Sequence, residues 1–274
     1  MARPPLLSRR TALTGLTLSA AALLDRTPTA AAAAPAAADM CLITPQSVEG
    51  PFYLDRELVR SQIGEGRPGV PLQVRLQVVE GASCAALAKA RVDIWHADAH
   101  GLYSGYDGQG DGRDISTTGQ KFLRGTQFTD KGGWVGFETI YPGWYDGRAT
   151  HIHFKVFLQT REVLTGQIYF PDALNEFIYT NVPAYQGRKA TRQVINANDM
   201  IATHDDPDHL AFCSVKEAKN RYVATLVVGV DRGAKVRSPE GPPPGPPPAG
   251  GPDAGPPPVP ALGDRVKALV PGAG

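Results

Sequence analysis

The chain has 274 residues, of which 42% are hydrophobic and 20% are charged, and its formal net charge at pH 7 is +1. This length allows one or two domains, and this composition suffices for a sizeable core. Removing residues 1–38 takes away four of the 28 Lys and Arg and one of the 27 Asp and Glu, which leaves a net charge of about −2. That balance argues against nucleic acid as a partner.

The first 38 residues have the composition of an export signal. Arg9 and Arg10 precede an apolar run of 14 residues, and an alanine-rich stretch follows it. The run is shorter than the ~20 residues that a membrane-spanning helix requires. The paired arginines favour the twin-arginine route, but Ala12 replaces the usual aromatic residue, so the general secretory route stays open. We therefore predict that the mature chain is exported, periplasmic or extracellular, and has no membrane span.

Three cysteines follow the predicted signal: Cys41, Cys84 and Cys213. In an oxidising compartment they allow one disulfide and leave one thiol over. Their spacing does not choose the pair and does not resemble that of a zinc-binding motif.

Residues 39–237 have the size of one domain and a mostly β pattern. Runs rich in β-branched and aromatic residues alternate with polar residues and are separated by turn signals. The predicted strands are Leu72–Glu80, Arg91–Ala97, Trp134–Tyr141, His151–Gln159, Glu162–Phe170 and Arg221–Val230. Helices are predicted over Pro171–Tyr179 and Gln186–Met200, without the regular αβ alternation of a parallel sheet. We predict an all-β fold, an antiparallel β-sandwich with short helices and long loops.

The predicted strand at His151 contains the strongest chemical signal. His151 and His153 point to the same face of a strand, because side chains alternate with period two. Two such imidazoles can bind one metal ion. If Tyr103 and Tyr145 join them, their hard phenolate oxygens favour a highly charged cation such as Fe(III).

Residues 238–274 contain 13 of the 25 prolines of the chain. This composition cannot form a packed core, and we predict a disordered or extended Pro/Gly-rich tail.

Several segments together resemble the intradiol ring-cleavage dioxygenases, the family of catechol 1,2-dioxygenase and protocatechuate 3,4-dioxygenase. They are TPQSVEGPFYLD (44–55), VDIWHADAHGLYSGYD (92–107), YPGWY (141–145) and HIHF (151–154). The resemblance covers about residues 41–230 and implies a β-sandwich enzyme.

The resemblance implies one Fe(III) per chain, bound by Tyr103, Tyr145, His151 and His153 and completed by water or hydroxide. It further implies that Tyr145 is the ligand that leaves when substrate binds. Only five residues separate Tyr145 from His151. Better-known members have a longer loop here, so their substrate preferences are not transferred.

Around the metal, the resemblance assigns a catalytic role to Arg148, which stabilises negative charge on the substrate, and to Gln167. It places Gly50, Pro51 and Phe52 in the wall of the substrate pocket. The implied reaction is cleavage of a small-molecule aromatic diphenol by O2 to a cis,cis-muconate type dicarboxylate. The chain leaves its oligomeric state open, and a homo-oligomer is compatible with it.

Two other classes of protein remain as alternatives. One is a non-catalytic, transthyretin-like sandwich that binds a partner and no metal. The other is a cupin-like metalloenzyme, which would need a carboxylate ligand near the histidine pair, and the run from His151 to Gln159 contains none.

Overall fold

The computed structural model describes residues 41–55, 58–234 and 236, so the predicted signal (1–38) and tail (238–274) lie outside it. Its strands form two four-stranded sheets. They are β1 (Pro71–Glu80), β2 (Arg91–Trp95), β3 (Arg124–Phe128), β4 (Trp134–Ile140), β5 (His151–Leu158), β6 (Arg161–Tyr169), β7 (Ser214–Ala218) and β8 (Arg221–Val230). The predicted β-sandwich is therefore confirmed.

The first sheet has the strand order β4-β1-β8-β7. Its β1–β4 and β7–β8 pairs are antiparallel, but β1 and β8 are parallel, with Leu72 opposite Tyr222. The predicted antiparallel sandwich is confirmed as the dominant arrangement, and this one pair departs from it. Only a tight hairpin forces two strands to be antiparallel, and β1 and β8 lie too far apart in the sequence to be joined by one.

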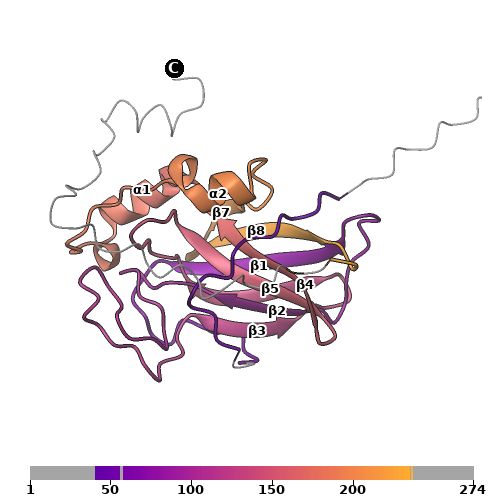
Figure 1. Ribbon diagram of the computed structural model, residues 1–274. Coiled ribbons are helices and arrows are strands. Elements are labelled where there is room, and N and C mark those ends of the chain that lie inside the picture. Colours follow the sequence, from indigo (N-terminus) through magenta and orange to yellow (C-terminus); the bar gives the residue numbers. More distant parts are fainter. Residues whose placement is uncertain (1–40, 56–57, 235, 237–274) are drawn as a thin grey trace, which may run out of the picture. The chain divides into compact units, whose positions relative to one another are not determined.

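The second sheet has the order β3-β2-β5-β6 and is antiparallel throughout. Figure 1 labels its strands β3, β2 and β5. One face of this sheet packs against the first sheet. There, Ile94, Ile152 and Phe154 are buried in the same apolar cluster as Val74 and Leu76 of β1. This cluster is the core of the described domain and fixes the second sheet, whose other face is polar.

All six predicted strands are present, with ends that differ by at most two residues, but β3 and β7 were not predicted. Strand β3 carries Arg124 and Thr126, both buried, so it lacks the expected apolar alternation. Strand β7 lies at the edge of its sheet and is mostly exposed. Neither segment needs the apolar pattern by which strands are recognised.

The first predicted helix is α1 (Asp172–Asn181), but the second prediction, over residues 186–200, is wrong. That segment is mainly irregular: one 3-10 helix (Pro183–Tyr185) precedes it, a second (Asn196–Asn198) lies within it, and α2 spans only Met200–Asp205. Side-chain contacts hold the irregular stretch in place: Arg188 pairs with Asp111 and lies over the Trp144 ring. None of the helices in the described part of the chain could cross a bilayer.

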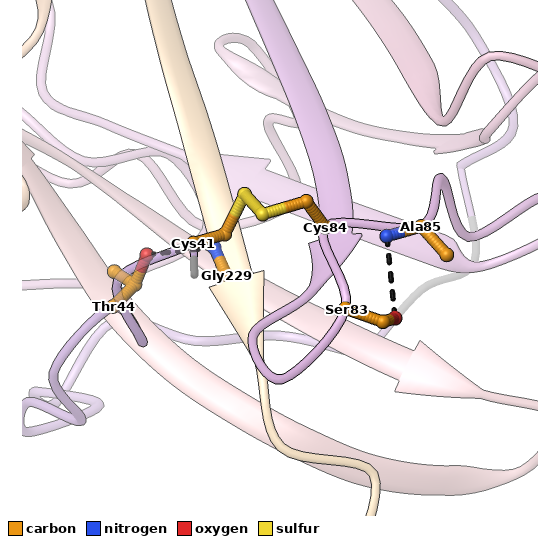
Figure 2. Close-up of a disulfide and its surroundings, with 6 residues drawn as sticks. All are labelled: Cys41, Thr44, Ser83, Cys84, Ala85 and Gly229. Carbon is orange, nitrogen blue, oxygen red and sulfur yellow. Dashed lines mark hydrogen bonds between the residues drawn. A yellow bond between two sulfur atoms is a disulfide. The ribbon is translucent and has the colours of Figure 1, made fainter. Parts of the chain in front are cut away.

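Before β1, residues 41–55 run across the sandwich and are called here the N-terminal strap. A disulfide joins Cys41 to Cys84, and Thr44 pairs with Gly229 of β8 through two hydrogen bonds of 2.9 and 3.1 Å (Figure 2). Cys213 is the remaining thiol of the three cysteines, and burial raises its pKa to about 12. The structure thus selects the disulfide that the sequence left open.

Candidate metal centre

The polar face of the second sheet holds the predicted histidine pair. His151 and His153 lie on β5 and are both buried. The β5–β6 register sets Tyr169 opposite His151 and Gln167 opposite His153, while Trp95 of β2 faces His153 from the other side. Trp95 stacks on the His153 ring, with centroids 4.9 Å apart and planes within 6°. The sheet therefore fixes His153 from both sides and His151 from the β6 side.

The two tyrosines reach the site from loops. Tyr103 lies between β2 and β3, and Tyr145 between β4 and β5. These loops pack backbone to backbone, because a Cβ added to Gly101 would lie 2.3 Å from the Trp144 carbonyl oxygen and one added to Gly143 would lie 2.2 Å from the Asp98 carbonyl oxygen. Only glycine permits this approach at either position.

The four rings gather in one place. Ring centroids are 5.5 Å apart for Tyr103 and Tyr145, 5.4 Å for Tyr145 and His151, 4.6 Å for His151 and His153, and 6.1 Å for Tyr103 and His153. The Nε2 atoms of the two histidines are 3.0 Å apart, and Tyr145 Oη lies 3.3 Å from His151 Nε2. The polar atoms of these side chains thus point toward a common point.

Hydrogen bonding assigns the His151 tautomer. Its Nδ1 lies 2.7 Å from the Ala149 carbonyl oxygen, which can only accept, so Nδ1 carries the proton and Nε2 has a free lone pair. This is the arrangement of a metal-binding imidazole. Burial, followed by the nearby Arg148 guanidinium, lowers the pKa of His151 to about 3. Burial also lowers the pKa of His153 well below its usual value, so both rings are neutral at pH 7.

The donor set fits a trivalent cation. Tyr103 Oη is buried, and no hydrogen bond of good geometry reaches it within the described residues. Burial raises the pKa of both tyrosines, so each keeps its proton unless a metal cation binds it. Nowhere in the described ranges do three His, Cys, Asp or Glu side chains gather to hold a metal, so an ion here needs the phenolates. Two phenolates and two imidazoles suit Fe(III).

Arg148, to which the family resemblance assigns a catalytic role, lies beside Tyr145. Its Nη1 is 3.4 Å from Tyr145 Oη, and its Nη2 is 2.5 Å from Gln167 Oε1. Gln167 in turn donates from Nε2 to the Val48 carbonyl oxygen at 3.0 Å, which fixes the direction of its amide. Arg148 thus adjoins Tyr145, and Gln167 joins the site through Arg148.

The predicted pocket wall belongs to the N-terminal strap. Gly50 has a φ of +72°, and a Cβ there would lie 3.3 Å from His153 Cε1. Phe52 stacks on Tyr103 with centroids 4.4 Å apart. Pro51, between them, is exposed. Its neighbours Gly50 and Phe52 therefore face the site, and Pro51 itself does not enter it.

Sequence reasoning missed four residues that support the site: Trp95, Gln109, Tyr169 and Asp199. Gln109 Oε1 accepts from the Tyr103 backbone N–H at 3.0 Å, and the Tyr169 hydroxyl donates to Gln167 Oε1 at 3.0 Å. Asp199 accepts from Arg148 Nε at 3.0 Å. Period-two alternation from Gln167 could have found Tyr169. Trp95 reaches His153 through the pairing of β2 with β5, and Gln109 and Asp199 act through loop contacts, none of which has a spacing signal.

Comparison with known proteins matches residues 44–215 to a family model described as Dioxygenase. Catechol 1,2-dioxygenase 1 of Acinetobacter lwoffii is 28% identical over 147 residues, which cover 45% of each chain. The chain therefore spans about half the length of the curated relatives that it matches.

Among solved structures, an intradiol ring-cleavage dioxygenase from Tetranychus urticae is 30% identical with a TM-score of 0.63, covering 70% of this chain and 95% of its own. The dioxygenase domain of a carbohydrate-binding fusion from Streptomyces sp. SirexAA-E is 29% identical with a TM-score of 0.51, covering 69% of this chain and 98% of its own.

Proposed function

This chain belongs to the intradiol ring-cleavage dioxygenase family, and from that premise we propose that it binds one Fe(III) and uses O2 to cleave a catechol-type diphenol between its two hydroxylated carbons. Both atoms of O2 enter the product, so catechol would give a cis,cis-muconate type diacid. The proposal takes Tyr103, Tyr145, His151 and His153 as ligands.

The single observation that carries this proposal is the convergence of the four rings, among which Tyr103 Oη is buried without a hydrogen bond of good geometry in the described residues. A buried phenol without a hydrogen-bond partner costs about 1–3 kcal/mol relative to a satisfied one. The cost is removed if the oxygen binds a cation as a phenolate. Two neutral imidazoles with their Nε2 atoms 3.0 Å apart supply the remaining protein donors.

When bound, Fe(III) would supply a Lewis acid that holds both diphenol oxygens and makes the ring reactive toward O2. The protein residues act on protons and charge. As a phenolate, Tyr145 Oη, beside Arg148, would be placed to accept one of the two protons that the substrate hydroxyls lose. Arg148 would stabilise negative charge that develops on the ring, in a site whose burial strengthens the interaction.

The surrounding residues would orient the substrate and exclude water. Gln167 holds Arg148 Nη2, and Phe52 covers Tyr103 from the strap. Trp95 fixes His153 from behind. Each contact reduces the freedom of a group that must meet the diphenol in one orientation.

We propose that this reaction takes place outside the cytoplasm. The Cys41–Cys84 disulfide supports that location, because structural disulfides persist in oxidising compartments.

Oxygen uptake by the purified chain with a panel of diphenols tests the proposal. We expect uptake of one O2 per diphenol and, with labelled O2, two labelled atoms in the diacid. Tyr145→Phe should abolish uptake, because the proton acceptor is lost. A parent chain that consumes no oxygen with any diphenol, or a variant that equals it, would contradict the proposal.

A further inference from the structure

An aspartate that the proposed chemistry does not use contacts Arg148 of the site. Asp199 is fully buried, 50 residues after Ala149 in the sequence. Its carboxylate accepts hydrogen bonds from four N–H groups within 3.1 Å. Burial alone would raise its pKa, but the Arg148 guanidinium and the backbone N–H groups of Ala149 and Ala202 outweigh that effect and hold the pKa below its ordinary value.

The two oxygens of Asp199 face different parts of the molecule. Oδ1 accepts from the backbone N–H groups of Ile201 and Ala202, at 2.8 and 3.1 Å, and so caps the first turn of α2. Oδ2 accepts from Arg148 Nε at 3.0 Å and from the Ala149 N–H at 2.7 Å. One carboxylate therefore ties the start of α2 to the segment that leads into the histidine pair.

The contact at Nε fixes the whole guanidinium. Its five N–H donors lie in one rigid plane, so holding Nε sets the directions of both Nη atoms. In this orientation Nη1 faces Tyr145 Oη at 3.4 Å and Nη2 faces Gln167 Oε1 at 2.5 Å. Arg148 also has only 12% of its side chain exposed, so an anionic partner offsets the cost of burying its charge.

We propose that Asp199 is a positioning residue for the reaction: it orients the Arg148 guanidinium toward Tyr145 and the substrate. This inference rests on the proposed function. Asp199 touches none of the four predicted ligands, and its effect reaches the chemistry through Arg148.

The competing explanation is that Asp199 only caps α2. Asparagine separates the two, because Asn and Asp are equally good helix caps. In Asp199→Asn the oxygen can still cap the helix, but the NH2 group then faces Arg148 Nε–H and the Ala149 N–H, donor against donor. We expect kcat for catechol to fall about 10–100-fold, as for other outer partners of reacting groups, with KM within about twofold.

Asp172→Asn is the matched control. Asp172 is partly buried, pairs with an arginine, Arg192, and accepts from the Asn196 backbone N–H at 3.0 Å, and none of its hydrogen bonds or ion pairs in the described residues reaches the site. We expect this variant to lose stability and keep its kcat. Equal losses of kcat in the two variants would mean general destabilisation and would overturn the proposal.

Iron per chain is the readout that does not depend on turnover. Because the ligands are unchanged, Asp199→Asn should retain the iron content of the parent. Loss of iron would show that Asp199 acts on His151 through the Ala149 peptide and would overturn the assignment to Arg148.

If Asp199→Asn does not fold, Arg148→Lys tests the same point. Lysine keeps the positive charge, but a single ammonium cannot hold Asp199 and also face Tyr145 and Gln167 in a fixed plane. The proposal predicts a kcat reduced at least about 10-fold, and a kcat equal to that of the parent would overturn it. A parent chain inactive toward every diphenol rejects the proposed function as well, whereas an active parent matched by Asp199→Asn and by Arg148→Lys rejects this inference alone.

Discussion

The two faces of the β3-β2-β5-β6 sheet are both buried, yet they carry opposite kinds of side chain. On β5, Ile152 and Phe154 face the first sheet and join the apolar core. Their neighbours His151 and His153 face the other way and meet the tyrosines. Adjacent residues of β5 thus have different roles: one packs in the core, and the next belongs to the site.

The structures that cover the two faces also differ in polarity. The inner face is covered by another sheet, whose contacts are apolar and non-directional. The outer face lies under the N-terminal strap, which is fastened by polar contacts: Glu49 pairs with the buried Lys155 at 2.7 Å, and the Tyr53 hydroxyl donates to Asp93 at 2.8 Å. Substitutions on the two faces should therefore affect different properties.

The largest expected effect is on the outer face. We expect His153→Ala to abolish diphenol-dependent oxygen uptake and to release the metal, because one of four ligands is lost. Far-ultraviolet circular dichroism should show that the sandwich remains. Uptake at the parent rate in this variant would contradict the ligand assignment.

The next residue tests the inner face. Phe154→Ala removes a fully buried ring from the core and should lower the free energy of unfolding by about 3–5 kcal/mol. Urea unfolding measures this loss, and oxygen uptake per folded molecule should stay near that of the parent. A variant that keeps its stability but loses oxygen uptake would contradict the assignment of Phe154 to the core face.

Much of this division could be predicted from the sequence. Period-two alternation placed His151 and His153 on one face, and six of the eight strands in the described residues followed from β-branched and aromatic patterns. Strand β3 was not predicted because it buries polar residues, and β7 was not predicted because it is an exposed edge strand. The helix predicted over 186–200 failed because side-chain contacts, which local propensity does not contain, hold that stretch in an irregular form.

The site shows the same limit. Residue types and spacing pointed to the two histidines and favoured the two tyrosines as their partners, and the family resemblance added Arg148 and Gln167. They could not point to Trp95 or Asp199, because strand pairing and a contact across 51 residues bring these beside His153 and Arg148. The disulfide partner of Cys41 likewise depended on the path of the strap.

Cutting the covalent anchor of the strap should have an intermediate effect. Replacing both Cys41 and Cys84 by serine should lower the free energy of unfolding by about 2–4 kcal/mol, since the unfolded chain gains freedom. Oxygen uptake should also fall, because Val48, Gly50 and Phe52 all contact the site from the strap. Cys213→Ala, which leaves the disulfide intact, is the control. Unchanged oxygen uptake in the double variant would show that the site does not depend on the anchored strap.

The smallest expected effect is a pH dependence of stability from His96, at the end of β2. Its Nε2 lies 2.8 Å from Thr139 Oγ1 of β4, and burial lowers its pKa to about 4. Because the unfolded chain binds the proton more readily, stability should be fully present above pH 6.5 and should decrease as the pH falls toward 4.

Between pH 7.5 and pH 5 this group alone should cost about 2 kcal/mol. Urea unfolding of the parent and of His96→Gln at both pH values measures the difference. An equal decrease in the two proteins would show that His96 does not contribute.

Iron analysis with visible spectroscopy on the folded, full-length chain and on Tyr103→Phe tests the central claim most directly. We predict one iron per parent chain and an intense visible band from phenolate bound to Fe(III), with the band weakened and shifted in the variant because one of two phenolates is lost. A folded parent that is colourless and free of iron when supplied with it, or a band that Tyr103→Phe leaves unchanged, would contradict the account.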